Sequence, residues 1–178
     1  MNLYFIFVQI IGFIAWILLG LSYYRKDTDR ILAFQVIANI LFCLHYLLLS
    51  AYSGLLICVF ELVRDYLYYK TDKDNYIFII SIIVYIISSI LTYTALLDVF
   101  PYVASTLDGF FLTKKKKMVV FGAIITYILW LIYDIYVVSW SGAITDGIII
   151  ISNLSILLFN IDLFDNDIVR RTFDKREN

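Results

Sequence analysis

The sequence predicts an all-α membrane protein in which seven transmembrane helices form two parallel three-helix repeats joined by a linker helix. The composition is the first reason: 62% of the 178 residues are hydrophobic and 16% are charged, against about half and about a quarter in soluble domains. The second is that the apolar residues gather in blocks of roughly 20, the length that crosses a bilayer as a helix. The third is a pattern that recurs 88 positions later in the chain.

Seven blocks are candidates for membrane-spanning helices, because runs such as YIFIISIIVYIISSIL lack the polar–apolar alternation of barrel strands. The first block has neither a basic leader nor a small-residue cleavage site, so we expect it to be retained as a helix. The fifth is short and contains Asp98, Pro101 and Asp108. The predicted spans are 3–23, 31–50, 53–70, 76–95, 98–113, 118–138 and 142–161.

The basic residues support the count of seven, including the short fifth span. With the N-terminus outside, 13 of the 14 Lys and Arg residues fall in segments 23–30, 68–75, 112–118 and the tail after 161. The remaining one, Arg64, is near the inner end of the third span. Because cytoplasmic loops collect Lys and Arg, we expect the N-terminus outside and the C-terminus in the cytoplasm.

An internal repeat organises the spans. The stretch LFCLHYLLLSAYSGLL (41–56) overlays ILWLIYDIYVVSWSGAI (128–144), so that two Ser-Gly turns and two basic loops coincide. We therefore predict a first repeat at 1–70, a linker helix at 71–96, a second repeat at 97–162 and a cytoplasmic tail at 163–178. Parallel repeats of this kind occur in transporters, which bind substrate near the midplane between the repeats.

The motifs also resemble a known family. A Gly-containing first helix, a basic turn, the entry ILAFQVIAN, and then LHY and AYSG are similar to the first half of the YgjV-type bacterial inner-membrane proteins, and WLIYDIYVVSWSGAITDGIIIIS to their later helices. The resemblance implies a multi-pass protein of the bacterial plasma membrane and supplies no substrate. The three-one-three plan also resembles the SWEET and PQ-loop (MtN3-like) carriers in fold, although the chain has no Pro-Gln pair.

The third span carries charges inside an apolar segment. Glu61 is near its middle, where a charge costs about 2.5–3.5 kcal/mol, so it needs a partner, water or a proton. Arg64 lies three residues on and shares its face, or its long side chain extends to the interface. Asp65, at similar depth, is expected to be solvated or to pair with Arg25 or Arg30.

Polar residues at helical spacing recur in the other spans, and two interpretations remain open. In one, the polar faces line a central cavity that binds a small polar solute or passes protons. In the other, they hold helices together through hydrogen bonds of about 0.6 kcal/mol each. The candidate cavity residues are Glu61, Arg64, Asp65, Asp146, Asn153, Asn39 and Trp130.

The candidate gate residues are His45, Asp134 and Asp108. His45 and Asp134 are both expected near the outer ends of their spans, so they could form a pH-sensitive gate if the second and sixth helices meet. The alternative is that His45 is an interfacial residue that makes one hydrogen bond.

The chain shows no phosphate loop, no HExxH motif and no metal-binding spacing, so we predict no enzyme, no cofactor and no metal, and no nucleic acid as partner. Cys43 and Cys58 are interpreted as packing residues. A hydrolase built on Glu61 or Asp146 is a remote alternative. The leading hypothesis is a small-solute carrier that works by alternating access in the lipid bilayer. The second is a non-transporting subunit that binds or regulates a partner; the sequence is compatible with an oligomer.

Overall fold

The computed structural model describes residues 3–22, 28–71, 74–111 and 116–159, and within these residues all regular structure is helical. Each predicted span corresponds to one α-helix, which confirms the all-α fold and the seven helices over the described chain. The helices are α1 (Leu3–Ser22), α2 (Thr28–Leu48), α3 (Tyr52–Lys70), α4 (Asp74–Thr92), α5 (Phe100–Phe111), α6 (Lys116–Tyr136) and α7 (Trp140–Phe159), with a short 3-10 helix, η1 (Leu96–Val99), before α5.

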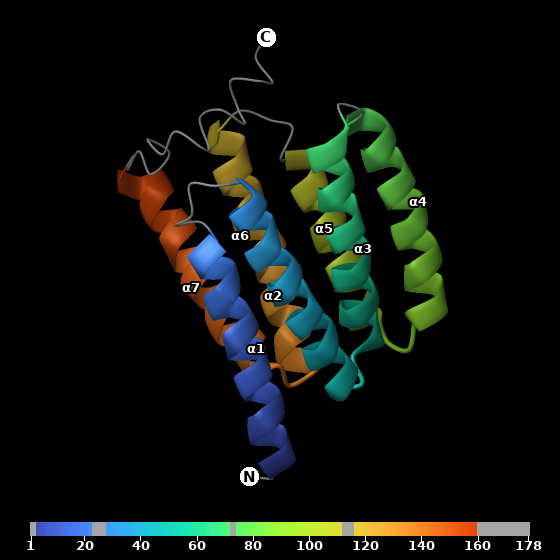
Figure 1. Ribbon diagram of the computed structural model, residues 1–178, viewed down its shortest axis with the longest axis vertical. Helices are drawn as coiled ribbons and strands as arrows, with labels where there is room; N and C mark the ends of the chain where they lie inside the picture. Colours follow the sequence, from blue (N-terminus) through green and yellow to red (C-terminus); the bar gives the residue numbers. More distant parts are fainter. Residues whose placement is uncertain (1–2, 23–27, 72–73, 112–115, 160–178) are drawn as a thin grey trace.

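Six of the described helices form a closed ring, and α4 lies outside it. Helix α1 packs on α2, α2 on α3, α3 on α5, α5 on α6, α6 on α7, and α7 on α1 again. Helix α4 packs against α3 and α5, at the edge of the molecule opposite α7 (Figure 1). The α2–α3 and α6–α7 turns lie at one end of the ring, which is called the turn end below.

Four of the described helices are long and apolar enough to cross a membrane, namely α1, α4, α6 and α7. Helix α4 shows the physical character of such a helix, because Ile79, Ile83, Ile86 and Ile90 leave at least half of each side chain exposed on its outward face. A helix suits this environment because it satisfies its own backbone hydrogen bonds where no water is available. Helices α2 and α3 fall outside this group because they carry charged residues, and α5 falls outside it because it is short.

Asp98 explains why the fifth span is short. Its buried carboxylate accepts hydrogen bonds from the backbone N–H groups of Thr94 (3.0 Å) and Ala95 (2.8 Å) and from the Thr94 hydroxyl. These bonds fix the turn that starts η1. Pro101 then falls in the first turn of α5, where its missing N–H costs no helical hydrogen bond. The acidic residue and the proline of this span therefore shape the entry to α5.

The turns that end α2 and α6 have the same geometry. In each, the last helical turn is closed by two backbone hydrogen bonds of the Schellman type, and a residue other than glycine adopts positive φ: Ser50 (58°) and Val138 (60°). The matching bonds, from N–H to carbonyl oxygen, are Ala51 to Tyr46 and Ser139 to Asp134, then Ser50 to Leu47 and Val138 to Ile135.

Replacing Val138 by glycine should stabilise the protein. A left-handed backbone costs an L-residue about 1–2 kcal/mol, and this exceeds the extra chain entropy of glycine, about 0.5–1 kcal/mol. Val138→Gly is therefore expected to raise the free energy of unfolding by several tenths of a kcal/mol to about 1 kcal/mol, measured by reversible unfolding in mixed micelles. The control, Val137→Gly, changes the neighbouring turn residue, which lacks positive φ, and should destabilise. Equal losses of unfolding free energy in both variants would contradict the positive φ of Val138.

Candidate functional site

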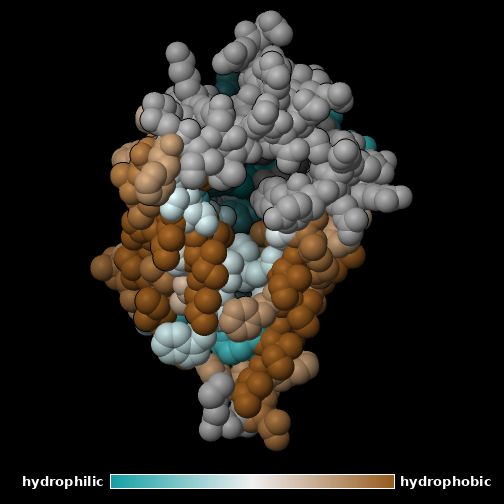
Figure 2. All heavy atoms as spheres, turned by 90° about the vertical axis from the view of Figure 1, so that its left-hand side faces the viewer, coloured by the Kyte–Doolittle hydropathy of each residue, from teal (hydrophilic) through white to brown (hydrophobic). Residues whose placement is uncertain are grey.

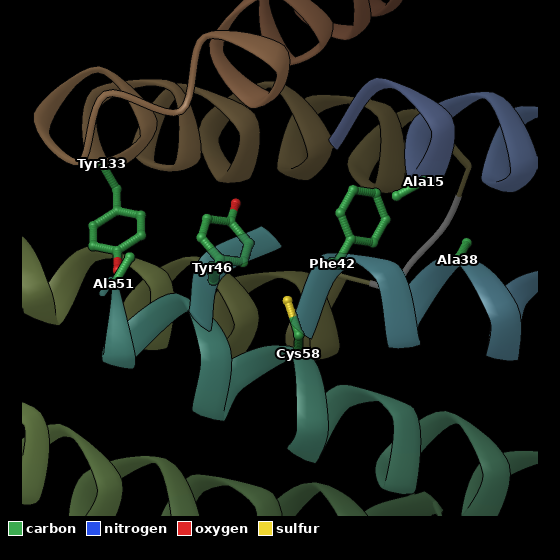
Figure 3. Packing of buried hydrophobic residues seen from close by; sticks show 7 residues of the cluster. All are labelled: Ala15, Ala38, Phe42, Tyr46, Ala51, Cys58 and Tyr133. Atoms are coloured by element: carbon green, nitrogen blue, oxygen red, sulfur yellow. The ribbon is translucent and has the colours of Figure 1, made fainter. Parts of the chain in front are cut away.

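Aromatic side chains of α2 and α6 fill the middle of the ring. The ring of Tyr46 lies 6.0 Å from Trp130 and 6.3 Å from Tyr133, measured between centroids. Figure 3 shows Tyr46 and Phe42 projecting from α2, Cys58 projecting from α3 beside them, and Tyr133 extending toward Ala51 in the α2–α3 turn. The two helices thus meet through long side chains rather than through close backbone contact.

A buried hydrogen bond connects the same two helices. The Tyr46 hydroxyl donates to Asp134 Oδ1 at 2.9 Å, and both side chains are buried. A second buried bond joins α6 to α3: the Tyr133 hydroxyl accepts from the backbone N–H of Gly54 at 2.9 Å. Because unpaired polar groups are costly in an apolar interior, the first bond specifies how α2 faces α6 and the second how α3 faces α6.

The glycines of the two Ser-Gly pairs, which lie in the first turns of α3 and α7, allow this approach. A Cβ atom on Gly54 would lie 2.8 Å from the Tyr46 ring, and a Cβ on Gly142 would lie 2.6 Å from the Asp134 carboxyl carbon. Both distances are shorter than normal carbon contacts. Each glycine therefore makes room for the side chain at the centre of the Tyr46–Asp134 bond.

A polar layer closes the turn end of the ring; we define it as Gln9, His45, Tyr46, Asp134 and Ser139. His45 is almost fully buried, and its Nδ1 lies 2.9 Å from the Val8 carbonyl oxygen of α1. Its Nε2 lies 2.9 Å from Ser139 Oγ in the α6–α7 turn. Ser139 Oγ also lies within hydrogen-bonding reach of the Asp134 carboxyl group. The side chains of His45, Ser139 and Asp134 therefore form a continuous row.

Gln9 completes the polar layer from α1 and was not among the candidates predicted from the sequence. Its Oε1 accepts from the Ser141 N–H at 2.9 Å, and its Nε2 donates to the Val138 carbonyl at 3.0 Å. The sequence feature that could have indicated it is that Gln9 is the one polar side chain in the apolar run IFVQIIGF. Such a residue must turn toward other helices because lipid offers it no partner.

Asp146 lies inside the ring, one helical turn beyond Gly142 on α7. Its side chain is 2% exposed, it interacts electrostatically with Asp134, and its Oδ2 atom has no hydrogen-bond partner among the described residues. Buried carboxylate oxygens are normally hydrogen-bonded. Asp146 is thus a polar group in the ring interior that can take up a donor.

A second polar cluster lies where α3, α4 and α5 meet. The Ser105 hydroxyl donates to Glu61 Oε1, and Arg64 donates to the Ser105 carbonyl at 3.3 Å. Arg64 also donates to the Tyr85 hydroxyl at 3.3 Å and lies 3.5 Å from Asp108 Oδ2. Arg64 is only 5% exposed, so its side chain points into the protein and not to the interface. There the Tyr85 and Ser105 oxygens accept its N–H groups, and Asp108 lies close enough to balance its charge.

The structure therefore divides the predicted site residues between two places. His45, Asp134, Asp146 and Trp130 lie in the ring interior. Glu61, Arg64 and Asp108 lie at the α3–α5 seam, so Asp108 is not beside the other two gate candidates. Asn39 is partly buried on α2, and Asn153 donates to the Ile149 carbonyl of its own helix at 2.9 Å. The side chain of Asp65 falls outside the described residues, as do those of Arg25 and Arg30.

Comparison with known proteins gives one match. A model of the family Imp-YgjV, described as a bacterial inner membrane protein, matches residues 6–159. The chain belongs to this family. The match confirms the resemblance to the YgjV family and, with the apolar helices, the bacterial inner membrane as its location. No curated protein and no solved structure matches the chain. For this YgjV-family protein, the likeness to SWEET and PQ-loop carriers and the sides on which the termini lie stay predictions.

The close approach at Gly142 gives a testable consequence. Gly142→Ala should lower the free energy of unfolding by about 1–3 kcal/mol, the usual cost of overpacking, because the new methyl group would displace Asp134 and Ser139. Gly147→Ala on the same helix is the control: nothing lies within 4 Å of its added Cβ, and alanine favours helix. Thermal unfolding in detergent measures both. Equal stability of the two variants would contradict the packing described.

Proposed function

We propose that the protein is a small-solute transporter of the bacterial inner membrane that works by alternating access. The observation that carries the proposal is Asp146, whose Oδ2 is buried inside the ring without a hydrogen-bond partner among the described residues. Ionisable residues at membrane depth are costly, and they often mark solute or ion pathways. The carboxyl group lies one helical turn further along α7 than Gly142, next to Asp134 of the polar layer.

The order of the helices agrees with the predicted duplication of three helices, one linker and three helices, and this supports the proposal. If α1, α2 and α3 are exchanged for α5, α6 and α7, the order of neighbours around the ring is unchanged. Helices α2 and α6 begin and end 88 residues apart, and so do their hydrogen-bonded turns. Helix α4 lies outside the ring, as a linker between parallel repeats would.

The bonds of the polar layer join the two proposed repeats. Tyr46 to Asp134, His45 to Ser139 and Gln9 to Ser141 each connect residues 1–70 with residues 97–162. Each such bond contributes roughly 0.6–1.5 kcal/mol net. A rocking motion that opens the turn end would therefore break a few bonds of modest strength, as an exchange between two populated states requires.

The ring interior also bears on the class of solute. Figure 2, seen from the α7 side, shows less hydrophobic surface between two hydrophobic ridges. Asp146 offers a hydrogen-bond acceptor, and the rings of Trp130 and Tyr46 offer aromatic faces that attract cations. We propose a small polar solute that carries hydrogen-bond donors or positive charge, bound by Asp146 and Trp130.

The alternative function is a non-transporting subunit that binds or regulates a partner. It is favoured by the cluster at the α3–α5 seam, where Glu61 and Arg64 bind groups of the neighbouring helices as interhelical contacts do. A groove of about 300 Å³ also lies between α4 and α5, next to this cluster. Its lining is mainly apolar and includes Ile86, Ile90, Val103 and Leu107, which suits a lipid chain or a partner helix.

Uptake into proteoliposomes separates the two functions. Vesicles with wild-type protein, with Asp146→Asn, and without protein are incubated with a uniformly ¹³C-labelled extract of bacterial metabolites, and trapped solutes are identified by mass spectrometry. We expect at least one small polar solute to be enriched by the wild type and at least tenfold less by Asp146→Asn.

Gly147→Ala is the matched control, because it lies on α7 with no atom near its added Cβ, and it should transport like the wild type. If no solute exceeds the level in empty vesicles, the transport function is wrong. Equal enrichment by wild type and Asp146→Asn would remove Asp146 from the site.

A further inference from the structure

The row formed by His45, Ser139 and Asp134 constrains where its protons lie. The Val8 carbonyl oxygen can only accept a hydrogen bond, so His45 Nδ1, 2.9 Å away, carries a proton. Ser139 has a single hydroxyl proton, yet its Oγ contacts both His45 Nε2 and the Asp134 carboxyl group. Ser139 can donate to only one of them, so the other must donate to Ser139.

Two arrangements satisfy every contact in this row. In the first, Ser139 donates to Asp134, and Nε2 of a positively charged His45 donates to Ser139. In the second, Ser139 donates to a neutral His45, and a protonated Asp134 donates to Ser139. Both arrangements contain one proton more than a neutral imidazole and a carboxylate would hold together. Both also have a net charge of zero, which suits a buried site.

We propose that His45 and Asp134 share one exchangeable proton through Ser139, and that this proton holds the polar layer closed. The shared proton moves by two coupled transfers through Ser139. The proton on the Asp134 carboxyl oxygen passes to Ser139 Oγ as the Ser139 hydroxyl proton passes to His45 Nε2. One O–H bond breaks and one forms at Ser139, a new N–H bond forms on His45, and a carboxylate is left on Asp134.

Loss of the proton breaks the row. Ser139 can then donate to His45 or to Asp134 but not to both, so one contact brings two lone pairs together. The site also gains an uncompensated negative charge in a buried position, which is unfavourable. Since the His45–Ser139 bond connects the two proposed repeats, its loss favours opening of the turn end.

The surroundings of the row supply an onward acceptor. The titratable groups that interact with Asp134 are Tyr46 from α2, Cys58 from α3, Tyr133 from its own helix and Asp146 from α7. Around His45, Val8 and Gly12 of α1 and Ser139 and Ser141 near the α6–α7 turn contribute neutral groups. Asp146 is the one carboxyl group among these neighbours, so it is the natural group to receive the proton or the solute that replaces it.

This proton would be the coupling ion of the carrier, and that part of the inference rests on the transport function proposed above. The sharing of the proton does not, because it follows from the hydrogen bonds alone. The chain contains a single histidine, so one ¹⁵N-labelled imidazole can be followed by NMR in the full-length protein in lipid nanodiscs after removal of any affinity tag.

The wild type should keep a proton on Nδ1 at every pH, while Nε2 changes its protonation or hydrogen-bond state in a single step as the pH rises. Asp134→Asn should abolish that step, because its amide can permanently donate to Ser139 and accept from Tyr46. In the pH range above the wild-type step, amide hydrogen exchange at residues 137–139 should become at least tenfold faster in the wild type but stay slow in Asp134→Asn.

Ser139→Ala tests the bridge independently of Asp134. It should give a histidine that titrates as an isolated imidazole, and Ser139→Thr should restore the wild-type profile. Asp108→Asn changes a carboxyl group of the other cluster and should leave the His45 signal unchanged. The inference is overturned if Nε2 titrates in the same way in the wild type, Asp134→Asn and Ser139→Ala, or if its state never changes with pH. Since no solute is present, this result and the uptake result can fail separately.

Discussion

The hydrogen bond from Tyr46 to Asp134 is the contact on which the rest of this structure depends. It joins α2 and α6, two helices whose backbones do not pack closely, across the centre of a ring of six helices. Lipid cannot satisfy either side chain, so each must find its partner inside the protein. Gly54 and Gly142 are needed because any larger residue would collide with one member of this pair.

The same constraint accounts for the polar layer and for the strained turns around it. Val138 keeps a positive φ at a position that glycine usually takes, and this places its carbonyl oxygen to accept from Gln9 and the next residue, Ser139, to reach His45. Strain of this kind is often found beside functional groups, which agrees with the position of the turn over the buried Asp146.

Much of the fold could be predicted from the sequence, because a bilayer fixes the length of a helix and excludes open strand edges. All seven described helices begin and end within a few residues of their predicted bounds. The short α5 was harder, since its start is set by the Asp98 carboxylate and not by hydropathy. The partners of buried polar groups were less predictable. Gln9 was not predicted. Glu61 was expected to need a partner, water or a proton, and its bond from Ser105 of α5 depends on which helices are neighbours. That order is decided by packing between apolar surfaces, for which the sequence holds little signal.

The most direct test of this account is a double-mutant cycle on Tyr46 and Asp134. The free energies of unfolding of Tyr46→Phe, Asp134→Ala and the double variant are measured in mixed micelles, and Tyr46→Phe combined with Asp108→Ala serves as the distant control pair. The account predicts a coupling energy of at least about 0.5 kcal/mol for the first pair and additivity for the control. Additive effects for Tyr46 and Asp134 would contradict it, because the two halves of the ring would then not meet through this bond.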